Sequence, residues 1–176
     1  MFPKSCIYDV NLNYNKINLE YSLTAIQIST FGVLLFRGKE LKGKELIQTA
    51  QKLDPYDTNV ILNSAFTLLI ESDYNKCISM FSYVISTNLN LSYAFANRGL
   101  AKILDNNVSN GLTDINKALE INVIEPYAHR SKGIYYFNSG NYKKALEHFR
   151  IAFKYGKDTY EVEEYIDSCL KKILEN

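Results

Sequence analysis

Two histidines, His129 and His148, are the side chains best suited to proton transfer or metal binding. Each falls on a segment with helical periodicity, and no cysteine, aspartate or glutamate stands one turn away on either predicted helix. A metal site needs several such ligands at close spacing. We therefore expect both histidines to be structural, and we predict no metal site and no catalytic residue.

The other reactive groups are three cysteines and scattered carboxylates. Cys6, Cys77 and Cys169 are odd in number and form no CxxC pair, which favours a reducing compartment over a disulfide framework. Cys77 and Cys169 are expected to be buried, whereas Asp114 and Glu147 are expected on exposed helix faces. No glycine-rich phosphate loop and no GxSxG motif occurs. The sequence thus indicates a protein without a cofactor and without enzymatic activity.

Charge and hydropathy restrict the class of partner. Twenty basic and 19 acidic residues leave a net charge of +1, and no basic run suits nucleic-acid binding. The most apolar window, residues 25–36, contains polar residues and is too short to span a bilayer. No apolar signal core follows the first residues, so a cytoplasmic protein is expected, although a lipoprotein whose leader had been removed stays open. The oligomeric state is not indicated.

Similar residue types recur at every thirty-fourth position of the chain. The small residues that recur at this interval are Ala65, Gly99 and Gly133, and the large apolar ones are Ile47, Phe81, Ile115 and Phe149. The period predicts four units, 24–57, 58–91, 92–125 and 126–159. Within the last unit, helical periodicity covers 127–139 and 142–155 on either side of a glycine-containing turn. Each unit is therefore predicted to be a helical hairpin.

Small residues are predicted to face each other where the two helices of a hairpin approach closely. The pairs are Ala65 with Cys77, Gly99 with Gly111, and Gly133 with Ala145. In the first unit strict spacing places Phe31 opposite Gly43. Either the large residue is compensated there, or Gly32 is the true partner and this hairpin is shifted by one residue.

The third and fourth units resemble the tetratricopeptide repeat (TPR), most clearly over residues 93–102 and 127–153. The resemblance covers 24–159 and implies an all-α fold, a right-handed superhelical solenoid of antiparallel helix hairpins. We expect repeats within 21–159 and a C-terminal capping helix within 160–176, which carries an apolar stripe. Residues 1–20 are expected to be extended or flexible; a segment lying in the groove, or a further helix, are the alternatives.

In the family that the repeats resemble, the first helix of each unit lines a concave groove and carries the ligand-facing side chains. Transferred to this sequence, the resemblance implies a partner-binding set of Asn63, Phe66, Tyr93, Asn97, Leu100, Tyr127, Arg130 and Ile134. Ser29, Asn63, Asn97 and Ser131 form a polar ladder at one repeat position, which we expect to contact a ligand backbone. The basic residues that clamp a terminal carboxylate in one branch of the family are mostly absent.

The function expected from these features is a non-catalytic protein–protein interaction scaffold that binds a peptide or partner protein in the groove. The alternative is a secretion-type chaperone, or an immunity- or inhibitor-like protein, that sequesters one effector. The sequence does not identify the partner or the pathway.

Overall fold

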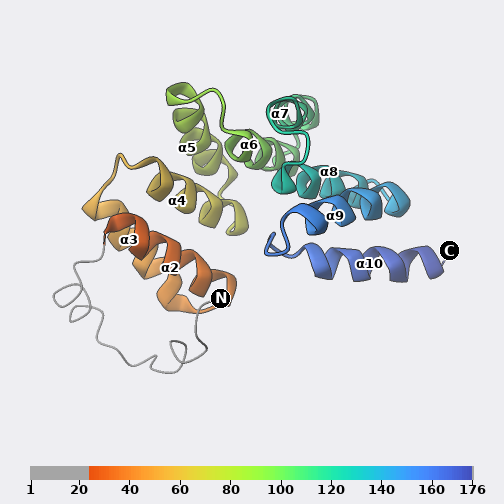
Figure 1. The fold of residues 1–176 in the computed structure, drawn as a ribbon, viewed down its shortest axis with the longest axis horizontal. Coiled ribbons are helices and arrows are strands. Elements are labelled where there is room, and N and C mark those ends of the chain that lie inside the picture. Colours follow the sequence, from red (N-terminus) through yellow and green to blue (C-terminus); the bar gives the residue numbers. More distant parts are fainter. Residues whose placement is uncertain (1–23, 176) are drawn as a thin grey trace.

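The computed structural model describes residues 24–175, which form nine helices and no strand (Figure 1). The predicted segment 1–20 lies outside the described residues. The helices are α2 (Ala25–Arg37), α3 (Leu41–Leu53), α4 (Thr58–Ile70), α5 (Tyr74–Thr87), α6 (Ser92–Leu104), α7 (Val108–Ile121), α8 (Pro126–Asn138), α9 (Tyr142–Tyr155) and α10 (Val162–Leu174).

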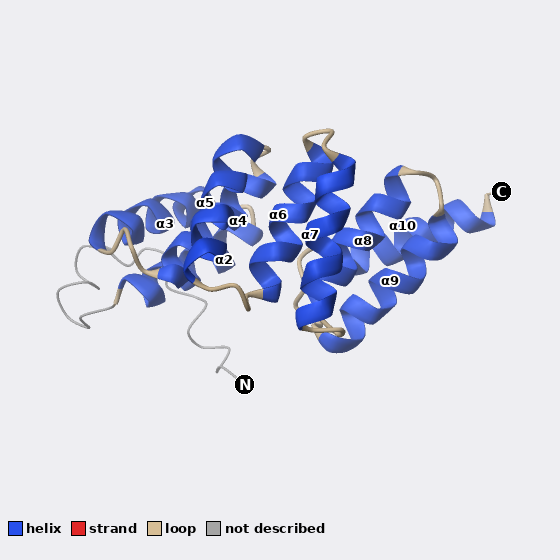
Figure 2. Ribbon diagram, turned by 90° about the horizontal axis from the view of Figure 1, so that it is seen from above, coloured by secondary structure: helices blue, strands red, loops and turns tan. Residues whose placement is uncertain are grey.

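The helices form four successive antiparallel hairpins, α2–α3, α4–α5, α6–α7 and α8–α9, and α10 packs against α9. The hairpins stack along the long axis of the molecule (Figure 2). The first helices α2, α4, α6 and α8 contact one another in series. In Figure 1, α4, α6 and α8 lie on the inner side of the arc and α5 and α7 on its outer side. The predicted fold class, an all-α helical repeat solenoid, is confirmed.

The turns inside the hairpins repeat one geometry. A residue with positive φ follows the first helix at Lys39, Ser72, Asn106 and Gly140. At the second turn the amides of Ser72 and Asp73 donate to the carbonyls of Leu69 and Leu68, which is the bond pattern of a Schellman motif. The other three turns have the corresponding bonds. The motif ends each first helix and reverses the chain.

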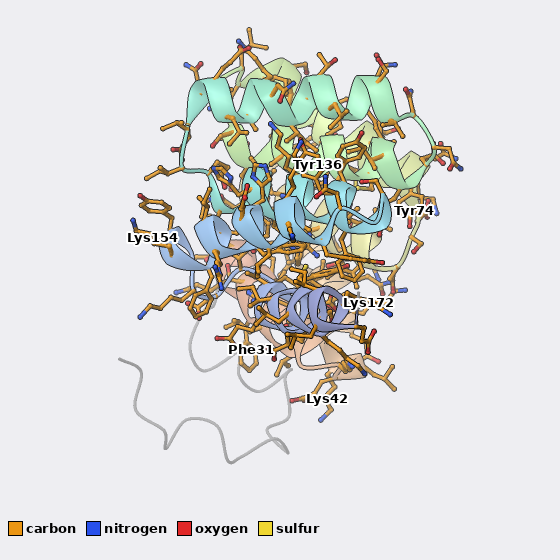
Figure 3. The ribbon with its side chains drawn as sticks, turned by 90° about the vertical axis from the view of Figure 1, so that its right-hand side faces the viewer. Phe31, Lys42, Tyr74, Tyr136, Lys154 and Lys172 are labelled. Carbon is orange, nitrogen blue, oxygen red and sulfur yellow. The ribbon has the colours of Figure 1, made fainter. Side chains whose placement is uncertain are left out.

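The first hairpin is shifted by one residue, as the second of the two alternatives proposed. Gly32 is buried against Gly43, whereas Phe31 is 47% exposed and lies near the lower edge of the molecule in Figure 3. The one-residue shift in register ends in the first turn of α3. There the amide of Gly43 donates to the carbonyl of Glu40, which lies three residues back rather than the four of a regular α-helix. The pair of glycines therefore lies where the helices are closest.

Burial of Asp114 contradicts the expected exposed position. Asp114 is 6% exposed, and both its oxygens accept hydrogen bonds of 2.8 Å from Arg98 on the preceding helix. Lys102 Nζ lies 2.8 Å from the same carboxylate, and Arg98 also donates to Ser82 of α5. Two cations surround one buried anion, so the group links α6 with α7 and α5.

Candidate functional site

Four of the eight predicted partner-binding residues come together in a cavity of about 330 Å³ on the inner side of the arc. These four are Phe66 of α4, Leu100 of α6, and Arg130 and Ile134 of α8. Each is nearly inaccessible, with exposures of 1–5%. The cavity wall also includes the C-terminal residues Tyr160, Glu161 and Tyr165. The chain's own C-terminal part therefore forms one side of the cavity.

Residues at one repeat position form part of the cavity wall. Ile70, Leu104 and Asn138 are the last residues of α4, α6 and α8, and each stands one repeat period after the one before. All three line the cavity, and none is fully buried. They are the cavity-lining residues of α4, α6 and α8 that are not buried.

The polar ladder lies between repeats rather than on an open surface. Asn63 donates to Ser29 Oγ at 2.9 Å, and Ser131 donates to the carbonyl of Ala96 at 3.1 Å, so each bond joins neighbouring first helices. Asn97 has no exposed surface and donates to the carbonyl of Tyr93 in its own helix. Ligand contact by Asn63 and Asn97 stays a prediction, and for Asn97 it requires a rearrangement of the packing.

Aromatic rings connect the predicted residues Tyr93 and Tyr127 to the cavity. Centroid distances are 6.4 Å from Phe81 to Tyr93, 4.8 Å from Tyr93 to Tyr127 and 5.9 Å from Tyr127 to Phe66. Phe66 then makes an edge-to-face contact with Tyr160, with 5.8 Å between centroids and 87° between ring planes. Burial raises the pKa of Tyr93 and of Tyr127, so both phenols are neutral. The row is a packed apolar surface with edge-to-face contacts.

Arg130 is the buried charged group of the cavity wall. It is 5% exposed, its Nε donates to the carbonyl of Tyr160 at 2.7 Å, and its Nη2 lies 3.9 Å from a Glu161 oxygen. Its Nη1 is buried and has no hydrogen-bond acceptor among residues 24–175. A buried donor without an acceptor costs free energy, so the guanidinium retains capacity for one more acceptor.

Sequence reasoning missed the C-terminal residues that line the cavity, Tyr160, Glu161 and Tyr165. It also missed Arg37 of α2, which donates to the carbonyl of Asp158 beside them. The repeat period ends at residue 159, so these C-terminal residues had no position in the repeat from which a role could be read. The available signal was an aromatic residue between acidic ones, at Asp158, Tyr160 and Glu161, in the short link to the last helix.

The two histidines of α8 and α9 form a pair outside the cavity. His129 Nε2 lies 3.0 Å from the carbonyl of Val123, which can only accept, so this nitrogen carries the proton. His129 Nδ1 is then the acceptor for His148 Nδ1–H at 3.1 Å, and the His148 ring stacks on Tyr136 (labelled in Figure 3). Burial, with His129 and Lys132 nearby, lowers the pKa of His148 to about 4. Burial also lowers the pKa of His129.

The histidine pair predicts a loss of stability in mild acid. An unfolded histidine binds a proton near pH 6.5, whereas folded His148 resists protonation until about pH 4. The unfolded state therefore binds more protons within this window, and the free energy of unfolding falls as the pH is lowered through it. Urea denaturation at about pH 7 and about pH 5, above most carboxylate titrations, measures the fall. His148→Gln keeps a hydrogen-bond donor towards His129 but cannot titrate, so the fall in the free energy of unfolding should be smaller in this variant. An equal fall in both proteins would contradict the attribution of the pH dependence to His148.

The two cysteines within residues 24–175 are buried and free. Cys77 and Cys169 have no exposed surface, and burial raises the pKa of Cys77 to about 12. Within residues 24–175 no group of three or more His, Cys, Asp or Glu side chains is arranged to hold a metal ion. No helix in that part of the chain is both long and apolar enough to cross a membrane.

Neither a protein-family model nor a curated protein matches the sequence. Solved structures do match. A chain of the APC/C hetero-tetramer Cut9–Hcn1 has a TM-score of 0.67 and 15% identity over 90% of this chain. A TPR protein from Parabacteroides merdae has a TM-score of 0.68 and 14% identity over 89%, and one from Thermus thermophilus has 0.68 and 16% over 85%.

This chain covers only part of the length of each of these matching chains. This chain spans 32% of the first matching chain, 62% of the second and 83% of the third. At 14–16% identity the likeness concerns the fold alone. The repeat period, the four hairpins and these matches together show that the protein has the fold of the tetratricopeptide-repeat proteins.

Proposed function

We propose that this chain is a non-catalytic cytoplasmic scaffold that binds a segment of a partner protein in the cavity between α4, α6 and α8. The observation that supports the proposal is the combination of Phe66, Leu100 and Ile134 with one buried cation, Arg130, whose Nη1 has no acceptor among the described residues. Ligand sites are typically apolar hollows with a few oriented polar groups. An acceptor on a partner would complete the hydrogen bonding of Arg130.

The test removes apolar surface from the cavity wall without adding charge. Asparagine is compatible with the helix ends, because Asn138 has the equivalent position in α8. We expect Ile70→Asn/Leu104→Asn to reduce partner capture from native lysate about tenfold, a loss of about 1.4 kcal/mol. Quantitative mass spectrometry of the retained proteins measures the loss, and circular dichroism checks the fold.

The matched control is Leu53→Asn/Leu89→Asn, which changes two leucines that are 56% and 68% exposed away from the cavity. This variant should retain the same proteins as the unmodified chain. Identical capture by all three proteins would contradict binding in the cavity. Recovery of one effector in stoichiometric amount would favour the sequestering role over a general scaffold.

A further inference from the structure

The link between α9 and α10, residues 156–161, lies against three inner helices. In Figure 1 it runs from the end of α9 towards the side of α2 and α4. The Arg37 guanidinium at the end of α2 donates to the carbonyl of Asp158. Phe66 of α4 meets the Tyr160 ring, and Arg130 of α8 donates to the Tyr160 carbonyl. One short segment therefore bridges helices from three hairpins.

The contacts of this segment are of the kind that a bound peptide makes. Its aromatic ring makes an edge-to-face contact with Phe66, and the guanidinium carbons of Arg37 and Arg130 lie 5.6 Å and 5.4 Å from the ring centroid. Its backbone carbonyls accept from the same two arginines. Cations near a ring face add an electrostatic attraction. The inner surface thus already accommodates a tyrosine with carboxylates beside it.

The internal segment leaves one hydrogen-bond donor of this surface, Nη1 of Arg130, without an acceptor among the described residues. Glu161 approaches Arg130 only to 3.9 Å, beyond hydrogen-bond distance, and Nη1 of Arg130 has no acceptor in residues 24–175. Glu161 also has a φ of 56°, a left-handed conformation that side chains other than glycine rarely adopt. A separate peptide is not joined to α9 and α10, so its backbone does not need this left-handed conformation. Such a peptide can place a carboxylate within hydrogen-bond distance of Nη1 of Arg130.

We propose that the cavity recognises a partner segment that presents a tyrosine flanked by carboxylates, and that residues 158–161 occupy this place until the partner displaces them. The inference rests on the proposed function and adds the chemistry of the partner. The tyrosine takes the place of Tyr160 beside Phe66, and a flanking carboxylate pairs with Arg130. Because the internal segment competes, the free protein binds more weakly than its open form.

The test uses a fluorescently labelled pentapeptide with the sequence of residues 157–161, amidated at its C-terminus so that no terminal carboxylate contributes. Tyr160→Ala empties the place of the ring and should bind the peptide at least about tenfold more tightly than the unmodified protein. Tyr155→Ala is the matched control, because the Tyr155 ring is 45% exposed and contacts Lys154 rather than the cavity. Fluorescence anisotropy measures the three affinities.

Two altered peptides test the chemistry on the Tyr160→Ala protein. Replacing the peptide tyrosine by alanine, or both its carboxylates by amides, should each weaken binding about tenfold, the range of a lost aromatic or charge-assisted contact. Equal binding of all three peptides would overturn the proposal. Failure of a folded Tyr160→Ala protein to exceed the Tyr155→Ala control would also overturn it.

A measurement on the unmodified protein covers the case in which Tyr160→Ala does not fold. Excess peptide should speed hydrogen exchange at the amides of residues 157–161, as the link is released, and slow it in α8. Unchanged exchange in both regions would contradict displacement. If sedimentation shows a dimer of the unmodified chain that Tyr160→Ala dissociates, the occupant is the same segment of a second copy, and the proposal is wrong.

Different results would reject the acidic tyrosine segment and the cavity as the binding site. Capture that depends on Ile70 and Leu104, together with no peptide binding, would retain the cavity as the site and reject the acidic tyrosine segment. Loss of both results would reject the proposed function itself.

Discussion

Replacing Asp114 with alanine is expected to lower the free energy of unfolding by about 3 kcal/mol, because removal of one member of a buried ion pair leaves an uncompensated charge. Asp114 accepts two hydrogen bonds from Arg98 and contacts Lys102, and its side chain is 8% exposed. Without the carboxylate, two largely buried cations of α6 are left without their common anion. Urea denaturation followed by circular dichroism measures the change.

The control for Asp114 is an ion pair at the surface. Lys117 and Glu120 lie 3.0 Å apart, with side chains 50% and 66% exposed. Glu120→Ala should change stability by less than about 1 kcal/mol, since such pairs are screened by water. Equal effects of Asp114→Ala and Glu120→Ala would show that the central network contributes no more than a surface pair.

Replacing Gly43 with alanine is expected to lower the free energy of unfolding by about 2 kcal/mol, the usual cost of forcing an extra carbon into a closely packed site. A methyl group there would lie 2.3 Å from the amide nitrogen of Phe36 and 2.6 Å from the carbonyl oxygen of Gly32. Both neighbours are backbone atoms, which cannot rotate away, so α2 and α3 must separate. The higher helix propensity of alanine, about 1 kcal/mol, offsets only part of the strain. The midpoint of thermal unfolding should fall accordingly.

Gly38 is the matched control for Gly43. It lies in the turn of the same hairpin at φ −75°, and the nearest atom to an added methyl group is 3.3 Å away. Gly38→Ala should therefore change stability by less than about 0.5 kcal/mol, as is usual away from such contacts. A cost for Gly43→Ala no larger than that for Gly38→Ala would contradict the close approach of the two helices.

Local patterns were sufficient for the repeat architecture. A hairpin contains its own turn and its own close approach of small residues, so the pairing of Gly99 with Gly111 could be predicted from spacing alone. The first unit required the structure. The choice between Phe31 and Gly32 depended on a turn of α3 with an i to i+3 bond, which sequence spacing does not reveal.

The sequence predicted part of the candidate site, because repeat position indicates which side of the arc a residue lies on. The resemblance named Phe66, Leu100, Arg130 and Ile134, which do line one cavity, because they occupy equivalent faces of successive inner helices. It also named Asn97, which is buried between helices. Repeat position indicates the inner side of the arc but not the depth of a side chain, since depth depends on how closely the neighbouring helices pack.

By itself the sequence determined the helical hairpins, the period at which they repeat and the absence of recognisable catalytic motifs, because these depend on short spacings. Only the tertiary structure decided that Asp114 is buried, that His129 meets His148, and that residues 160, 161 and 165 line the cavity. The contact of Arg37 with Asp158 joins residues 121 positions apart. Such a contact follows from the accumulated rotation of successive hairpins, which brings the end of α2 to the link between α9 and α10 and has no signature in local periodicity.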